Sequence, residues 1–351
     1  MIFLGAGASA AENVPLQRDL FKSYFRDPNY AANNDWSNTV KNFFRIAFDV
    51  DVSSLSANTE LPTFEEALGL IDLAILRNEG LRGLSGQEDC NLRLVRYHLV
   101  LLMADAVRRR MPQVAEVHRQ LIHNLRESGR LRTTAFITTN YDTLIDNALE
   151  DTARAPDPPQ QDSPVDYGLN STEPSLTENS RGTIVPLYKI HGSLNWLYCP
   201  VCSDMIVTRG ADIITRLQDT MSTARCTHCD TIREPIVVPP TYYKDLSNVY
   251  LALVWNNAVK TLREAVHLVF CGYSMPDADM HVKYLIKTAQ LNRGSESDPL
   301  QITLVNTYAG KNEPDKRSDL DRYSRFFGSS VTDSSKSFED FAANPSAVLR
   351  R

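Results

Sequence analysis

The first ten residues of the chain, MIFLGAGASA, restrict the folds that it can adopt more than any other stretch. Met1 to Leu4 have strand character, and the residues after them fit the pattern G-x-G-x-x-G/A of dinucleotide-binding turns, with Ala10 in the last position. Gly5 allows a tight turn out of the strand, and Gly7 lets a pyrophosphate approach the main chain because it has no Cβ. The same residues also fit a strand-to-helix turn without a ligand, so the motif alone leaves both interpretations open.

Short apolar segments alternate with helical patterns along most of the chain. The segments expected to be strands of one sheet are 1–4, 133–142, 182–193, 234–240, 267–274 and 301–308. The segments expected to be helices are 15–25, 63–76, 91–110, 113–129, 248–265 and 278–291. Thr63 and Glu66 have the spacing of a capping box, and Gly129 is suited to end a helix. Strands that alternate with helices predict an α/β fold with a Rossmann-like, doubly wound parallel sheet.

The predicted sheet is interrupted after its first strand by a long segment with helical patterns only. This predicts a helical insertion at 31–130, a small zinc-ribbon module at 199–230, and a Rossmann-like domain formed by 1–30, 131–198 and 231–351. Residues 151–181 are rich in Pro, Asp, Ser and Gln, which predicts a surface loop or a mobile segment. A dehydrogenase-type domain would place its second strand directly after the first helix, so an ordinary nicotinamide dehydrogenase is a poor fit.

The composition excludes several classes of function. The formal net charge of the 351 residues is -6, which disfavours direct nucleic-acid binding because phosphate contacts need clustered Lys and Arg. No apolar stretch reaches the length of a membrane span, and the N-terminus lacks the pattern of a signal peptide. We therefore expect a cytoplasmic protein without a membrane segment.

Three of the expected strands end in polar motifs, which are TTNYD at 138–142, KIHGSLNW at 189–196 and GYSMPDAD at 272–279. The carboxyl ends of parallel strands open into one crevice, so these motifs are expected to share a site with the glycine turn. The candidate residues are Asn140, Asp142, His191, Ser274 and Asp277.

Each of these residues also has a structural interpretation. Asn140, Asp142 and Asp277 are suited to cap the helices that follow them, and His191 can simply bind a nearby carbonyl group. The coincidence of three polar strand ends with one phosphate-type turn favours a binding site over these separate roles.

The cysteines form the most specific pattern in the chain. Four of the six lie in two C-x-x-C pairs, Cys199 with Cys202 and Cys226 with Cys229. Two such pairs predict a tetrahedral zinc site whose four thiolates leave no position for water, so the metal is expected to be structural. His228 could replace one ligand. The remaining two, Cys90 and Cys271, are expected to be buried apolar residues.

The ordered set GAGAS, TTNYD, KIHGS, C-x-x-C…C-x-x-C and GYSMPDAD resembles the sirtuin family from Met1 to about Tyr308. The resemblance implies a Rossmann-type NAD+ domain with a smaller zinc and helical module. By position, the residues that match the family's phosphate loop are Gly5, Ala6, Gly7 and Ser9. Those that match the nicotinamide-ribose pocket are Asn140, Asp142 and the adjacent Thr139, and His191 matches the catalytic histidine.

The resemblance extends to the late strand ends. Gly272, Ser274 and Asp277 fall where the family contacts the phosphates or the adenosine ribose. Asn306 matches an asparagine near the adenosine.

Two segments depart from the deacylase pattern of the family. ENVPLQRDLF replaces the usual loop after the phosphate turn, and VVPPTYYKDL replaces the Phe-Gly-Glu stretch after the zinc module. Those regions help place an acyl-lysine peptide, so the sequence looks like the divergent prokaryotic immune branch, whose members mostly hydrolyse NAD+. The four cysteines are instead a feature shared with the deacylases.

The resemblance thus implies a glycohydrolase that cleaves NAD+ to nicotinamide and ADP-ribose and depletes it in phage-infected cells. In this mechanism His191 acts as general base, Asn140 orients water or holds the ribose hydroxyls, and Asp142 stabilises positive charge or binds the carboxamide. The alternatives are an NAD-dependent lysine deacylase and a non-catalytic module that senses NAD+ or ADP-ribose. The implied partners are a second copy of the chain and a HerA-like ATPase or another sensor protein.

Overall fold

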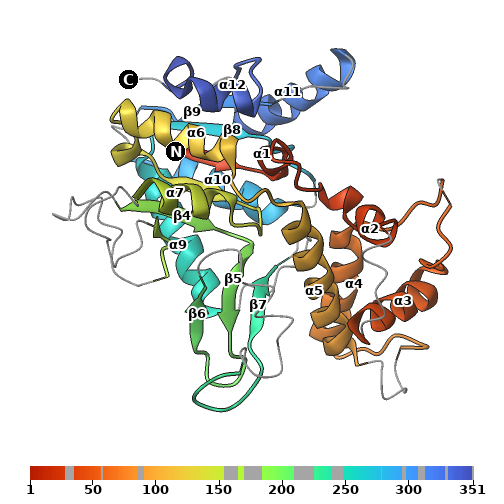
Figure 1. Ribbon diagram of the computed structural model, residues 1–351. Coiled ribbons are helices and arrows are strands. Elements are labelled where there is room, and N and C mark those ends of the chain that lie inside the picture. The colour runs from red at the N-terminus through yellow and green to blue at the C-terminus, as the bar shows by residue number, and fades with distance from the viewer. Residues whose placement is uncertain are drawn as a thin grey trace. The chain divides into compact units, whose positions relative to one another are not determined.

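A computed structural model of the chain describes two compact units (Figure 1). The residues described are 1–27, 35–56, 58–84, 91–153, 165–169, 184–208, 225–238, 248–277, 279–294, 298–306, 313–328 and 331–349. The first unit comprises 1–13, 111–192 and 244–351, and the second comprises 14–110 and 193–243. The domain boundaries expected from the sequence remain a prediction.

The first unit contains a seven-stranded sheet with the order β10-β9-β8-β1-β2-β4-β3. Its strands are β1 (Ile2–Leu4), β2 (Phe136–Thr138), β3 (Val165–Asp166), β4 (Val185–Lys189), β8 (His267–Cys271), β9 (Gln301–Val305) and β10 (Val331–Asp333). Every described strand pair is parallel. Each residue of β1, β2, β4 and β8 is buried, as expected for strands covered on both faces. The predicted doubly wound parallel sheet is confirmed.

Helices cover this sheet in two groups (Figure 1). The first group contains α6 (Glu116–Glu127), α7 (Leu144–Ala153) and α12 (Phe338–Ala343), and the second contains α9 (Val249–Glu264) and α10 (Met280–Leu291). The unit also includes α1 (Ala6–Ala10), α11 (Glu313–Phe327) and the 3-10 turns Leu131–Thr133 and Pro345–Ala347.

The register of the sheet aligns the ends of its central strands. Leu4 pairs with Thr138 on one side and with Cys271 on the other, and Thr138 in turn pairs with Lys189. The strand order reverses at β1, because the chain continues to β2 on one side and returns later to β8 on the other. Ligands of doubly wound sheets bind beside such a reversal, at the carboxyl ends of the strands.

The described part of the second unit combines four helices with a three-stranded sheet of order β6-β5-β7. The helices are α2 (Gln17–Phe25), α3 (Asp35–Phe48), α4 (Phe64–Leu76) and α5 (Leu92–Arg110), and the strands are β5 (Gly192–Tyr198), β6 (Met205–Val207) and β7 (Glu234–Val237). Arg96 of α5 connects the two layers, because it binds the Asp72 carboxylate at 2.6 Å and the Val237 carbonyl at 3.0 Å.

Aromatic side chains pack the helices of the second unit together. The Phe21 ring lies 4.8 Å from that of Phe44 and 6.0 Å from that of Phe64, measured between ring centres. The capping box predicted at the start of α4 is confirmed, since Thr63 and Glu66 each accept the other's backbone N–H. Local capping and apolar packing thus fix the same helix.

One predicted strand belongs elsewhere. The apolar run 234–240 does not extend the parallel sheet, because its described part forms β7 of the three-stranded sheet. A short apolar run indicates a buried strand but does not identify its partner. The strand β5 was not expected, and the helix expected from Pro15 begins at Gln17.

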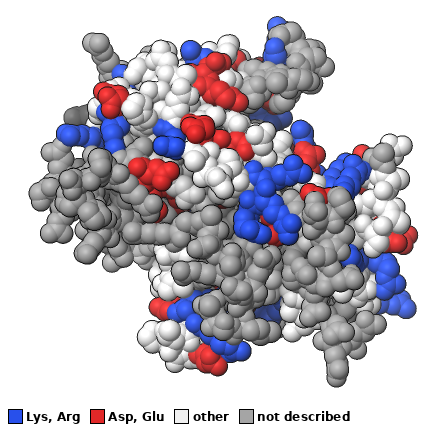
Figure 2. Space-filling view, in the orientation of Figure 1, with Lys and Arg blue, Asp and Glu red and all other residues white. Residues whose placement is uncertain are grey.

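Figure 2 shows one face of the molecule, on which basic residues (Lys and Arg) and acidic residues (Asp and Glu) are interspersed among the described residues. Within the described ranges, no helix combines the length and the apolar character that crossing a membrane requires. Most of the loop expected at 151–181 lies outside the described residues, as does Cys90.

Candidate functional site

Three glycines bring the turn after β1 against the turn after β8. Gly7 donates its N–H to the Gly272 carbonyl at 2.8 Å, and Gly5 donates to the Cys271 carbonyl at 2.9 Å. A Cβ on Gly7 would lie 2.7 Å from Cα of Gly272, and one on Gly272 would lie 2.4 Å from the nitrogen of Ala8. Gly272 also has a φ of +62°, which favours glycine. Because glycine has no side chain, the backbones of the two turns can contact each other directly. The role of Gly5, Ala6 and Gly7 in binding a pyrophosphate remains a prediction.

Asn140 joins the loop after β2 to the glycine turn. Its side-chain N–H group donates to the Gly5 carbonyl at 2.8 Å and to the Ser9 hydroxyl at 2.7 Å. Its backbone N–H binds the Thr138 hydroxyl, which itself donates to the Leu4 carbonyl. This half-buried amide is therefore held in one orientation at the sheet edge.

Asp142 completes the cluster around Ser9. The Ser9 hydroxyl donates to its carboxylate at 2.6 Å, and the Leu144 N–H donates to the other oxygen at 3.1 Å. The second bond is the capping role that the sequence left open. Both Ser9 and Asp142 are buried, so the two functions of Asp142, capping α7 and binding Ser9, are combined in one carboxylate.

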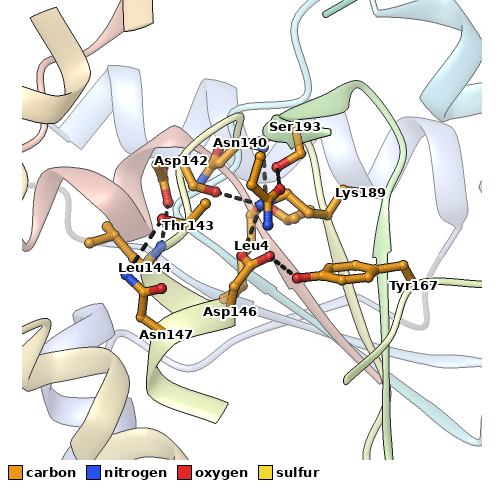
Figure 3. Close-up of polar contacts among 12 residues, drawn as sticks. Leu4, Asn140, Asp142, Thr143, Leu144, Asp146, Asn147, Tyr167, Lys189 and Ser193 are labelled. Carbon is orange, nitrogen blue, oxygen red and sulfur yellow. Dashed lines mark hydrogen bonds and ion pairs between the residues drawn. The ribbon is translucent and has the colours of Figure 1, made fainter. Parts of the chain in front are cut away.

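A buried ion pair stabilises the loop between β2 and α7 (Figure 3). Lys189 has no exposed surface, and its ammonium group donates to the Asp142 carbonyl and to the Asp146 carboxylate, the latter at 2.9 Å. Tyr167 donates to the second Asp146 oxygen at 2.6 Å. A buried charge is tolerated when it is paired and hydrogen-bonded, and here the pairing fixes the main chain two residues after Asn140. No feature of the sequence indicated this role of Lys189.

His191 lies in the turn between β4 and β5 and is fully buried. Its Nε2 atom is 3.5 Å from a carboxylate oxygen of Asp279. The ring of Tyr141, next to Asn140, lies 6.4 Å from the His191 ring. Strand register therefore brings the glycine turn, Asn140 and His191 to the same edge of the sheet.

The other residues implied by the resemblance lie around this edge. Thr139 donates its N–H to the Leu4 carbonyl at 3.3 Å, and Asn306 directly follows β9. Ser274 is exposed, and its carbonyl accepts from Arg322 at 2.7 Å.

Asp277 does not occupy the N-cap position of α10, which belongs to Asp279. Its exposed carboxylate instead pairs with Lys283 at 3.1 Å, and this hydrogen bond lowers the pKa of Asp277.

The four predicted metal ligands lie together in the second unit. The Sγ atoms of Cys199, Cys202, Cys226 and Cys229 are all within 4.8 Å of one another, and the shortest pairs are 3.3 and 3.4 Å apart. A tetrahedral Zn²⁺ with Zn–S bonds of about 2.3 Å requires sulfur atoms about 3.8 Å apart. Hydrogen bonding to Thr231 lowers the pKa of Cys229, whereas hydrogen bonds with the neighbouring cysteines raise the pKa of Cys202. The donor set fits zinc.

The two C-x-x-C loops have the same backbone structure. Cys199 N–H binds the Asp204 carbonyl and Ser203 N–H binds the Cys199 carbonyl. The second loop repeats both bonds, with Cys226, Asp230 and Thr231 in the corresponding positions. The residue after each second cysteine is left-handed, with a φ of 60° at Ser203 and 59° at Asp230.

A buried arginine connects the two loops. Arg233 donates to the Asp204 carboxylate of the first loop and, at 2.9 Å, to the Arg225 carbonyl beside the second. It also lies 3.8 Å from the Cys226 sulfur, where its charge favours the thiolate form. Arg233 was not predicted from the sequence, because its spacing from the cysteines follows no known ligand pattern.

The chain matches a family model described as the SIR2-like domain over residues 134–325, more than half of its length. It belongs to the SIR2-like family. This finding agrees with the sirtuin resemblance of the sequence motifs, while the prokaryotic immune branch remains a prediction. The SIR2-like chain matches no curated protein sequence.

Similar solved structures include two complexes of Sir2 proteins. One contains the inhibitor EX-527, 2'-O-acetyl-ADP-ribose and a deacetylated p53 peptide; it is 13% identical, with a TM-score of 0.39, and the match covers 97% of the SIR2-like chain and 89% of that chain. The other contains a p53 peptide and NAD+; it is 14% identical, with the same TM-score and the same coverage. A structure from work on the mechanism and regulation of Sir2 enzymes is 14% identical, with a TM-score of 0.42 and coverage of 97% and 88%. The family assignment rests on the match over 134–325.

Proposed function

We propose that the protein is an NAD+ glycohydrolase that cleaves the bond between nicotinamide and ribose. Membership of the SIR2-like family supports the use of NAD+. The observation that carries the proposal is that Asn140 and Asp142 contact the turn after β1, where the strand order reverses, and that strand register brings His191 to the same edge of the sheet. The chemistry needs an anchor for the dinucleotide, a group that orients the attacking oxygen, and a base.

The proposed roles follow from the properties of each side chain. Cleavage passes through an oxocarbenium-like state, which a carboxylate such as Asp142 stabilises. The Asn140 amide is already fixed by Gly5 and Ser9, so its carbonyl oxygen is oriented to bind a water molecule or a ribose hydroxyl. An imidazole accepts a proton near neutral pH, which suits His191 as the base.

Substrate access requires a conformational change in this proposal. His191 has no exposed surface, so the residues that cover it must move before a ribose can reach the imidazole. Closure of an active site around its substrate excludes bulk water from an electrostatically stabilised intermediate.

A lysine deacylase is the second candidate function. The cysteine cluster favours it, because the four cysteines are a feature shared with the sirtuin deacylases. The segment 12–21, which replaces the deacylase loop, favours the hydrolase, and most of the second departing segment, 237–246, lies outside the described residues.

Chromatography of the products from NAD+, with and without an acetyl-lysine peptide, distinguishes these functions. We expect nicotinamide and ADP-ribose from NAD+ alone, and a decrease in kcat/KM of about 100-fold or more in His191→Ala and Asn140→Ala. Leu76→Ala, at an exposed position of α4, is the control for expression and folding.

Two outcomes would contradict the hydrolase. Turnover that depends on the peptide would identify a deacylase, and binding of NAD+ without turnover would identify a sensing module. Full activity in folded His191→Ala would exclude the role of that side chain.

The biological role belongs to the same proposal. The sequence resemblance implies a cytoplasmic antiphage effector that acts as a homo-oligomer or beside a HerA-like ATPase or another sensor. Cells that carry the wild-type chain should lose NAD+ on infection, whereas cells that carry His191→Ala should keep it.

A further inference from the structure

Asp279 is a buried carboxylate that the sequence motifs did not single out. It is 1% exposed, and it lies between two side chains of the first unit. One oxygen is 3.5 Å from Nε2 of His191, and the other accepts the Tyr273 hydroxyl at 2.7 Å. The hydrogen bond from Tyr273 therefore offsets part of the desolvation penalty of the buried Asp279 carboxylate. The other carboxylate oxygen faces the imidazole.

The position of Asp279 at the start of α10 suggests a different role, which the geometry excludes. It is the N-cap residue of α10, yet its side chain accepts no backbone N–H of that helix. Asn248, the N-cap of α9, does cap its helix and accepts from the N–H groups of Tyr250 and Leu251. A side-chain N-cap bond contributes about 1 kcal/mol to helix stability. The Asp279 side chain does not make this bond and lies beside His191 instead.

In the described part of the chain, Asp279 is a charged group that lies beside the His191 ring. Three described elements are close to His191 or to its neighbour Ile190: Tyr141 follows β2, Trp255 of α9 donates to the Ile190 carbonyl at 2.8 Å, and Asp279 begins α10. Of these three side chains, Asp279 alone is charged at neutral pH. The Lys189 ammonium, two residues before His191, is directed at Asp142 and Asp146.

We propose that Asp279 is the positioning residue of His191, whose proton it fixes at Nε2 so that Nδ1 is the basic atom of the ring. This inference rests on the proposed hydrolysis. A carboxylate at one ring nitrogen selects the tautomer that carries its proton there, and it stabilises the imidazolium that forms during the reaction.

The reaction balances with this assignment. The water oxygen attacks the anomeric carbon, and its proton passes to Nδ1 of His191. The electron pair of the broken carbon–nitrogen bond leaves with neutral nicotinamide, and the imidazolium returns its proton to solvent. The products are nicotinamide, ADP-ribose and one proton. Asp279 remains ionised throughout and stabilises the transient positive charge.

The pH profile of kcat/KM tests this role. Asp279→Asn keeps the shape of the side chain but removes its charge, so it should lower kcat/KM at pH 7 by about 10- to 100-fold. It should also shift the acidic limb of the profile to lower pH by about one unit, because the protonated imidazole loses its counter-charge.

Tyr273→Phe should shift the same limb in the opposite direction. This change removes a hydrogen bond from the carboxylate and concentrates negative charge beside His191. The matched control is Asp105→Asn on α5, an equally buried carboxylate whose partners are Arg108 and Arg109. An acidic limb that lies at the same pH in the wild type, Asp279→Asn and Tyr273→Phe would overturn the proposal.

A second measurement does not depend on activity. ¹H–¹⁵N spectra of the full chain with labelled histidine report the tautomer of each ring, and His191→Ala identifies the signals of that residue among the seven histidines. We expect a proton at Nε2 in the wild type and a mixture of tautomers in Asp279→Asn. If His191 carries its proton at Nε2 but the protein does not cleave NAD+, the proposed function is rejected and the positioning role is retained. A proton at Nδ1 in the wild type would reject the positioning role.

Discussion

The sheet-edge site of the first unit and the cysteine cluster of the second unit hold their loops together in different ways. At the sheet edge, residues from distant parts of the chain meet because Gly5, Gly7 and Gly272 have no side chains. In the cysteine cluster, two short loops of the same structure present identical side chains to one another. The first arrangement depends on close packing of the whole unit, whereas the second depends on the chemistry of four thiols.

The cysteine cluster should show the largest effect of a single substitution. Cys226→Ser removes one of the four predicted zinc ligands, so we expect loss of zinc from the purified protein and a decrease in the stability of the second unit of about 5 kcal/mol or more, since structural zinc contributes at least this much to small modules. Elemental analysis measures the metal, and limited proteolysis between β5 and β7 measures the stability.

Cys271→Ala is the control for this substitution. Cys271 is buried in β8, outside the cluster, and burial raises the pKa of its thiol. Its loss should leave the zinc content unchanged. Equal zinc content in Cys226→Ser and the wild type would show that the four thiols are not the metal site.

The glycine contact should show the next largest effect. Gly272→Ala places a Cβ 2.4 Å from the backbone of Ala8 at a φ of +62°, so it should lower the free energy of unfolding of the first unit by about 3 kcal/mol. Gly129→Ala is matched in backbone conformation, with a φ of +69° and no atom within 4 Å, and should cost about 1 kcal/mol. Thermal unfolding of both variants measures the difference. Equal losses would show that the close contact between the two turns has no energetic role.

The smallest effects concern a feature that the two units share. Thr63 begins α4 with a capping box in the second unit, and Ser337 begins α12 with another in the first. Thr63→Ala and Ser337→Ala should each lower local stability by about 1 kcal/mol, because each removes an acceptor for a backbone N–H. Hydrogen exchange in the first turn of each helix is the measurement, and a loss several times larger in one helix would refute the equivalence.

The elements that the sequence predicted well are those with a local signal. Continuous apolar runs identified β1, β2, β4, β8 and β9, and capping residues located the start of α4. Pairing between strands has no such signal, so the run at 234–240 was assigned to the wrong sheet. The strands β3 and β10, with two and three residues, are too short to show a period.

The site divides in the same way. Motifs at strand ends indicated Asn140, Asp142 and His191, because parallel strands direct their carboxyl ends to one edge. Asp279 was missed in favour of its neighbour Asp277, since both fit the start of a helix and only the fold decides which one is buried. Residues that come together only in the folded structure, such as His191 and Asp279, have no characteristic spacing in the sequence by which they could be predicted.

The matching backbone of the two cysteine loops has a consequence for how the module tolerates change. Each loop closes through its own hydrogen bonds over six residues, from Cys199 to Asp204 and from Cys226 to Thr231. Neither set of bonds involves a residue of the other loop, so a substitution that opens one loop leaves the backbone hydrogen bonds of its counterpart in place.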